Sequence, residues 1–301
     1  MIIPKKNKMY KLFIIFILFW FSTNYAFSQY NKNEELIFDF QKKLYNYEFI
    51  DAQKQLAQIE NSKIEKDLKL FLKITFYRSQ IQSFNNLENY DSLCFEKSKI
   101  LIKHFSNYDS LSFDQIFILV STYFYITEID ISNKKYIRAA LNLREITKYI
   151  ELIISTYKKN EKLKLIAGIY FFYAELAAED HLVLQPILYF FPKGDKKKGL
   201  KLLLECTSSK DFIICTEAYN FLARIYFRDE KIYKLAELFY KNLVLKYPKN
   251  LNWQAELFKV YKKNINSEKQ KSQFETYSKE LENNNQLNDI QKNIFRNKIK
   301  K

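Results

Sequence analysis

The sequence predicts an all-α protein built as a solenoid of antiparallel helix pairs. The 301-residue chain contains only 3 Gly and 4 Pro, too few for the closely spaced turns of an all-β fold. Its apolar residues recur at intervals of three and four, which is the period of a helix. The predicted helices are short, and a pair of short helices buries its apolar face only by stacking on the next pair.

The predicted helices follow one another in pairs along the chain. Leu36, Phe40 and Leu44 share one face of the first helix, and later segments show the same pattern. Ile, Phe and Tyr also favour strands, but their spacing does not alternate, so the helical period decides. The expected pairs are residues 34–46 with 49–60, 63–84 with 89–105, 110–130 with 134–157, 160–181 with 196–206, and 212–228 with 231–247, followed by a helix at 252–264.

The chain divides into three parts. Residues 1–28 precede a predicted helical repeat domain at residues 29–265. Residues 266–301 are rich in Lys, Asn and Gln and carry few apolar anchors. For this last part we expect a C-terminal helix or a partly disordered tail.

Residues 1–28 have the pattern of a signal peptide. Four lysines precede an apolar run at residues 12–21, and Ala26 and Ser28 are small residues at the positions that a signal peptidase reads. The run is shorter than the roughly 17 to 25 residues of a transmembrane helix. We therefore expect an exported protein, located in the periplasm or cell envelope or secreted. The alternative is an uncleaved N-terminal anchor.

The mature chain is expected to be basic. Loss of four lysines with the signal peptide leaves 45 basic and 34 acidic side chains, a net charge of +11. Outside the cytoplasm such a protein meets anionic lipid, acidic polysaccharide or acidic protein before nucleic acid. Its basic residues are spread over most segments, so we predict no nucleic-acid partner. The simpler interpretation is that the lysines form solvated helix faces.

No segment has the pattern of a catalytic, cofactor or metal site. Gly194 and Gly199 have the spacing of a phosphate loop, but the residues that follow are not the required Lys and Ser or Thr. We expect a turn there, with Asp195 capping the next helix. The acidic and histidine residues at 179–181 lack the spacing of a zinc site. We predict no enzyme activity, no cofactor and no metal.

The three cysteines leave two alternatives open. Cys206 and Cys215 lie at nearly equal distances from a turn near Lys210, so they would face each other on antiparallel helices. Either they form a disulfide or they are buried free thiols. Cys94 is expected in the core.

One segment, residues 216–250, has a recognisable motif. The pattern is aromatic, Leu, small, Tyr, then Ala, aromatic and Pro, at Tyr219, Leu222, Ala223, Tyr226, Ala236, Tyr240 and Pro248. This motif resembles the tetratricopeptide repeat (TPR). Ala stands where the family usually has Gly at position 223, and the interval from Tyr226 to Ala236 is one residue longer than in the family. Residues 168–199, with an apolar hairpin at 182–191, are similar to exported bacterial TPR-type proteins, many of Bacteroidetes character.

The resemblance implies a right-handed α-solenoid whose first helices line a concave, partner-binding face. On that face it places Glu217, Asn220, Arg224, Phe227 and Arg228. Because Asn220, Arg224 and Arg228 are spaced at four, they project in one direction and could clamp a carboxylate of a peptide. The alternative is internal pairing, in which Glu175 and Glu179 of the preceding first-type helix neutralise the two arginines.

The expected function is therefore that of a non-catalytic, exported scaffold or adaptor. It would bind protein or peptide partners at the cell envelope through its concave helical face. The alternative is a peripheral envelope protein whose basic surface binds anionic lipid or glycan. Salt separates the two, because binding to an anionic surface weakens steeply as ionic strength rises.

Overall fold

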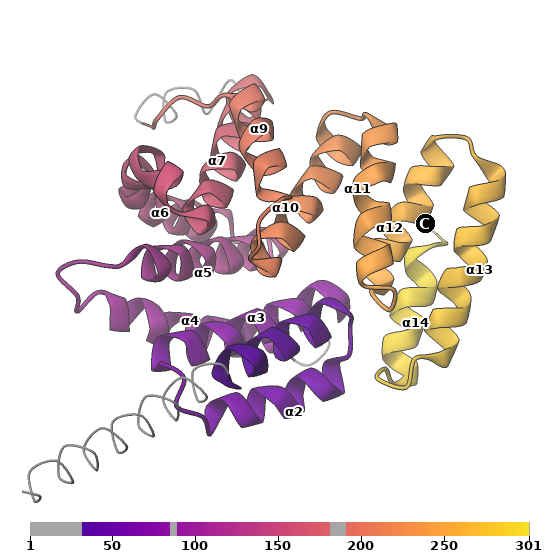
Figure 1. The fold of residues 1–301 in the computed structure, drawn as a ribbon, viewed down its shortest axis with the longest axis horizontal. Coiled ribbons are helices and arrows are strands. Elements are labelled where there is room, and N and C mark those ends of the chain that lie inside the picture. The colour runs from indigo at the N-terminus through magenta and orange to yellow at the C-terminus, as the bar shows by residue number, and fades with distance from the viewer. Residues whose placement is uncertain (1–31, 85–88, 181–190, 301) are drawn as a thin grey trace, which may run out of the picture.

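The computed structural model of the protein describes residues 32–84, 89–180 and 191–300 (Figure 1). Within these ranges the chain is helical and contains no β-strand, so the predicted all-α class is confirmed there. The predicted signal peptide at 1–28 and nearly all of the apolar segment at 182–191 lie outside the described residues.

Consecutive helices pack in pairs, as the sequence predicts. The first pair is the helix at 32–45 with α2 (Phe49–Glu60). The following pairs are α3 (Lys66–Phe84) with α4 (Tyr90–Phe105), α5 (Phe113–Ser132) with α6 (Tyr136–Thr156), α7 (Glu161–Asp180) with α9 (Lys196–Cys206), α10 (Phe212–Arg224) with α11 (Tyr233–Lys246), and α12 (Leu251–Lys263) with α13 (Ser267–Asn283). The short η1 (Tyr157–Lys159) follows α6, and α14 (Asp289–Lys298) comes last. First helices also contact first helices, α3 with α5, α5 with α7, and α7 with α10.

The turns inside four of the pairs are built alike. Tyr47, Lys134, Lys231 and Ile265 each have a positive φ of 54° to 61°, and each lies two residues before the second helix of its pair. After Lys134, for example, the N–H of Lys135 donates to a carbonyl five residues earlier at 2.8 Å. This closure satisfies a carbonyl at the end of the first helix. The recurrence of one turn at one position is consistent with a helical repeat.

A π-helical turn, η3 (Ile225–Asp229), explains the long spacing in the repeat motif. It continues α10, and the N–H of Glu230 donates to the carbonyl of Ile225 at 3.0 Å, five residues back instead of four. Such a turn absorbs one extra residue without ending the helix. Tyr226, within this turn, and Ala236, after it, therefore both remain buried.

All three glycines of the chain lie where α7 and α9 approach each other closely. A Cβ at Gly199 would come within 2.6 Å of the backbone nitrogen of Phe172, and a Cβ at Gly194 would overlap the backbone of α7. No glycine has a positive φ, so close helix packing excludes a side chain here. Asp195 caps α9 by accepting from the N–H of Lys198 at 2.9 Å, as the sequence predicts.

α13 and α14 occupy most of the C-terminal part of the chain, residues 266–301. Tyr277 and Phe295 are fully buried, and the Tyr277 hydroxyl donates to the Phe295 carbonyl at 2.7 Å. These contacts attach α14 to α13. Few apolar residues are enough, because Tyr277, Leu281 and Phe295 are almost completely covered.

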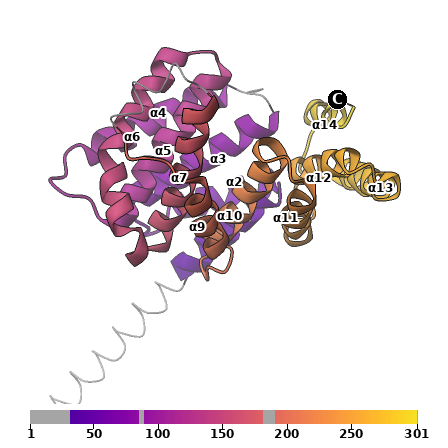
Figure 2. The same ribbon diagram turned by 90° about the horizontal axis from the view of Figure 1, so that it is seen from above.

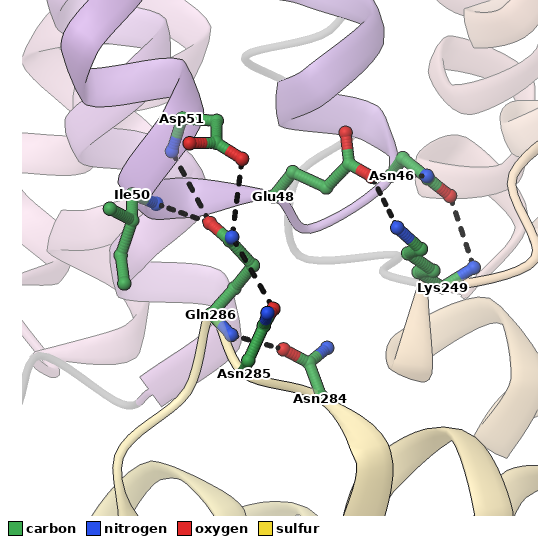
Figure 3. A network of polar contacts seen from close by, with 8 residues as sticks. All are labelled: Asn46, Glu48, Ile50, Asp51, Lys249, Asn284, Asn285 and Gln286. Atoms are coloured by element: carbon green, nitrogen blue, oxygen red, sulfur yellow. Dashed lines mark hydrogen bonds and ion pairs between the residues drawn. The ribbon is translucent and has the colours of Figure 1, made fainter.

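The first and last pairs contact each other although they lie at opposite ends of the chain (Figure 3). The Lys249 ammonium lies 2.7 Å from Glu48, and the Lys249 N–H donates to the side chain of Asn46 at 3.0 Å. The Gln286 amide oxygen accepts from two backbone N–H groups at the start of α2, and its NH₂ donates to Asp51 at 3.2 Å. These partners are at least 201 residues apart in the sequence.

A hydrophobic cluster beneath these polar contacts joins the same two ends. The Phe84 ring lies 5.3 Å from that of Phe49 and 5.8 Å from that of Phe295, centroid to centroid. Tyr47 lies 5.9 Å from Phe295. In both views α10 and α11 lie between the helices α3 to α7 and the helices α12 to α14 (Figures 1 and 2). Because the first and last pairs meet, the series of pairs curves back on itself around a partly open interior.

The three cysteines are free thiols, so Cys206 and Cys215 form no disulfide; Cys206 is buried, as the second sequence alternative predicts, whereas Cys215 is half-buried. Cys94 and Cys206 are buried, and burial raises the pKa of each thiol to about 12. The Cys215 thiol donates to the carbonyl of Thr207 at 3.2 Å.

Candidate functional site

Five of the first helices, namely the helix at 32–45, α3, α5, α10 and α12, line a cavity of about 710 Å³, which we call the inner cavity. Cavities of about 300 to 1,000 Å³ are typical of ligand sites. Helices from both ends of the chain contribute to its wall, because the two ends meet. The principal lining side chains are Gln41 and Tyr45 of the helix at 32–45, Arg78 and Gln82 of α3, Tyr125 and Glu128 of α5, Glu217, Asn220 and Arg224 of α10, Arg228 of η3, Tyr240 of α11, Trp253, Glu256 and Lys259 of α12, and Lys298 of α14.

Four of the five residues predicted to bind a partner line the inner cavity. Glu217, Asn220, Arg224 and Arg228 recur at three and four positions and so lie on one side of α10 and its continuation. Phe227 packs instead against the rings of Tyr233 and Tyr240 on α11, with centroids 6.0 and 6.4 Å away. The structure thus brings the polar residues together and places Phe227 in helix packing.

Three of these four residues are engaged with other helices. Glu217 accepts from the Tyr45 hydroxyl at 2.8 Å, which ties α10 to the first helix. The Asn220 amide oxygen accepts from the Trp253 indole N–H at 3.1 Å. Arg228 lies 3.3 Å from Glu256 of α12. Asn220 and Arg228 therefore connect α10 and its continuation to α12, and a clamp that uses both of them freely is not present.

Arg224 differs from its neighbours on α10. Among the described residues, no hydrogen bond or salt bridge reaches its guanidinium, which lies 5.8 Å from the centroid of the Phe221 ring. Its charge still acts on Glu128 across the cavity and, together with Arg78, it lowers the pKa of that carboxyl against the raising effect of burial. Arg224 is therefore a cation in the wall with no direct acidic partner.

The sequence alternative of internal pairing gave these arginines the wrong acidic partners. Glu175 accepts from the backbone N–H of Lys196, and Glu179 pairs with the ammonium of the same lysine. Both glutamates thus serve the contact between α7 and the start of α9. The acidic partner of Arg228 comes from the following pair, at Glu256.

A second polar group lines another part of the inner cavity. The Arg78 guanidinium donates to Glu128 at 2.9 Å and lies 4.2 Å from the centroid of the Tyr125 ring. Gln82 donates to the same carboxylate at 3.0 Å. This group joins α3 to α5. Burial raises the pKa of the Tyr125 hydroxyl to about 12, so the ring presents a neutral phenol to the cavity.

Lys298 brings a cation from the last helix into the wall. Its ammonium donates to the Ser83 carbonyl at 3.0 Å and to the Asn252 side chain at 2.5 Å. Burial lowers the pKa of Lys298 from 10.5 to about 8, and the nearby charge of Lys259 adds to this effect. Two neutral acceptors thus hold this ammonium in place of a carboxylate.

Sequence reasoning missed the residues that other pairs contribute. The spacing within one helix identifies a shared face, and it found the polar side of α10 in this way. Arg78, Trp253 and Lys298 belong to separate helices, and no local pattern indicates that their faces converge. Their convergence depends on how the first and last pairs meet.

The chain matches no protein-family model, and comparisons with characterised proteins and with solved structures found no match. The fold and the inner cavity define an all-helical protein of sequentially packed helix pairs. Across the described ranges, no helix is both long and apolar enough to cross a membrane. The same residues contain no group of three or more His, Cys, Asp or Glu side chains placed to hold a metal ion.

Proposed function

We propose that the protein is an exported, non-catalytic binding protein of the TPR-like, right-handed solenoid type, which takes a peptide segment of a partner into its inner cavity. The observation that carries the proposal is the inner cavity of about 710 Å³, lined by five of the first helices of the pairs. The export part of the proposal rests on the lysines and apolar run within residues 1–28.

The composition of the wall favours a peptide. Tyr45 and Trp253 stack with centroids 6.0 Å apart, and such aromatic surfaces contact apolar side chains. Amides and charged groups surround them, and these can pair with the polar backbone of an extended segment. A cavity of about 710 Å³ favours a narrow, extended segment over a folded domain.

A photo-crosslinking phenylalanine at Gln82 tests this function. Gln82 lies in the cavity wall, and Lys99 on the exposed surface of α4 serves as the matched control position. After irradiation of native envelope fractions, we expect a defined peptide or protein adduct from position 82 and none from position 99. Equal adducts at both positions, or none at either, would contradict the proposal.

Sedimentation with anionic vesicles tests the surface-binding alternative. Binding that is lost steeply between low and physiological salt would favour a peripheral role for the basic surface. The yield of adduct at position 82 is expected to stay the same at both salt concentrations, because the partner binds inside the cavity.

A further inference from the structure

The first half of α6 exposes an apolar face, which we call the outer α6 face. Its side chains are Tyr136, Ile137, Ala140, Leu141 and Leu143, and none of them lines the inner cavity. From the exposure of this face and its charged border we infer that it binds the surface of an anionic phospholipid membrane. The inference goes beyond the proposed function. It also differs from a dispersed basic surface, because apolar side chains make the contact.

The first step is the exposure of the face. The side of α6 that packs against other helices carries its four buried residues, Ala139, Ile146, Ile150 and Ile153. On the outer side, Ile137 is 83% exposed, Tyr136 63% and Leu141 49%. Single exposed apolar residues are common on protein surfaces, whereas a contiguous apolar patch marks a surface that contacts a partner.

The second step is a contrast within the same helix. The helical period places Lys148, Glu151, Leu152 and Ser155 on the same side of α6 as the outer α6 face, further along the helix. These four residues are exposed, and only one of them is apolar. The exposed side of α6 is therefore apolar in its first half and mostly polar in its second half.

The third step is the charge around the face. Residues 130–148 carry five basic and two acidic side chains, a net charge of +3. Lys134 and Lys135 are exposed in the turn directly before the face, and the Arg144 side chain is 71% exposed directly after it. Of the two acidic residues, one is fully buried and the other half-buried. Positive charge therefore borders the apolar residues, which fits an anionic partner.

The fourth step is the choice among partners. A two-fold contact between two copies of the chain would set the outer α6 face against itself and bring the same cations together. A helix of another protein usually docks in a groove, whereas these side chains project from one helix. A lipid surface needs no groove. It takes up apolar side chains at the boundary of the acyl chains, while Lys and Arg stay among the anionic headgroups.

An environment-sensitive fluorescent amino acid at position 137 of the full chain tests the inference. Position 155 is the matched control, because Ser155 is exposed on the same side of α6, about 27 Å further along the helix. The probes are vesicles of phosphatidylcholine and phosphatidylglycerol in equal parts, and vesicles of phosphatidylcholine alone. With the anionic vesicles we expect a blue shift at position 137, with quenching by nitroxide-labelled acyl chains, and neither effect at position 155.

Variants that carry the fluorescent residue at position 137 assign the binding to the named groups. Leu141→Asn is expected to weaken binding to anionic vesicles about threefold to tenfold. Leu152→Asn is the control, because Leu152 is 42% exposed but lies in the polar half of α6. Lys134→Gln combined with Lys135→Gln is expected to weaken binding by about tenfold or more. All variants share the same N-terminal residues, so differences among them come from α6.

Three results would overturn the inference directly: equal signals at positions 137 and 155, equal affinity for both kinds of vesicle, or equal effects of Leu141→Asn and Leu152→Asn. A signal at position 137 that depends on protein concentration without vesicles would identify a second copy as the partner instead. A lower melting temperature of Leu141→Asn without vesicle binding would show that another part of the chain covers the face. Crosslinking at position 82 tests peptide binding in the inner cavity independently of these results.

Discussion

Arg224 and Arg228 lie one turn apart on the same side of one helix, yet their neighbours give them different roles. Arg228 reaches Glu256 of the next pair, whereas no acidic group of the described residues reaches Arg224. A buried or half-buried cation without a partner is expensive unless a ligand supplies the counter-charge. At the scale of the residue, the absence of an acidic partner therefore indicates function as much as the residue type does.

Lys298 gives a prediction for the dependence of stability on pH. Its pKa is lowered to about 8 in the folded protein, from 10.5. Between these two pH values the unfolded chain binds more protons, so the contribution of Lys298 makes the free energy of unfolding rise with pH. We expect the stability of the wild type to increase relative to that of Lys298→Met from about pH 8 to 10.5, as measured by urea unfolding at each pH.

Lys262→Met is the matched control, because Lys262 is an exposed lysine of the neighbouring α12. Comparing both variants with the wild type removes the effect of the buried tyrosines, which all three proteins share. Parallel stability curves for the wild type and Lys298→Met would show that the ammonium is not desolvated.

At the scale of the element, the turns show how pairs form with so few glycines. Four turns use a residue with positive φ that is Tyr, Lys or Ile, while all three glycines serve the contact between α7 and α9. A left-handed conformation costs a non-glycine residue roughly 1 to 2 kcal/mol. The same turn nevertheless recurs, which indicates that the packing of each pair imposes it.

Ile265 is the most strained of these turn residues, since it is β-branched, has a φ of 54° and is 92% exposed. We expect Ile265→Gly to raise the free energy of unfolding by about 0.5 to 1 kcal/mol, because relief of strain exceeds the added entropy of the unfolded chain. The midpoint of denaturant unfolding measures the change.

The same substitution at Ile100 should have the opposite sign. Ile100 is 42% exposed in the middle of α4, where glycine costs about 0.5 to 1 kcal/mol. A lower midpoint for Ile265→Gly would mean that the turn is not strained.

At the scale of the whole molecule, the contact between the first and last pairs brings helices from both ends together around the inner cavity. Tyr47 and Phe295 form the apolar part of this contact, and Lys249 and Gln286 form its polar rim. Both termini of the described chain thereby become part of the site. Loss of either end would open the inner cavity without touching α10.

Phe295→Ala tests this closure. The Phe295 side chain is fully buried in the cluster shared by both ends, so its truncation is expected to cost about 3 to 5 kcal/mol. We expect faster hydrogen exchange not only in α13 and α14 but also in the helix at 32–45 and in α2. Phe105→Ala, in a cluster formed by α3, α4 and α5, is the control and should leave the exchange of α14 relative to its neighbours unchanged.

The sequence by itself determined the helices up to residue 264, whereas α13 and α14 stand where it left a single helix or a partly disordered tail open. The period of the apolar residues placed helices within a few residues of their observed bounds, because each helix must bury one face, and the spacing at four identified the polar side of α10. The extra residue between Tyr226 and Ala236 was also visible, although its accommodation in a π-helical turn was not.

Only the tertiary structure decided which residues of other pairs contact those helix faces. Glu256, Lys298 and Tyr45 come to the wall from pairs distant in sequence, so no local pattern could assign Arg228 its acidic partner or leave Arg224 without one. The physical reason is that helix periodicity is set within a few residues, whereas the curvature that brings the first pair against the last accumulates over every contact between pairs.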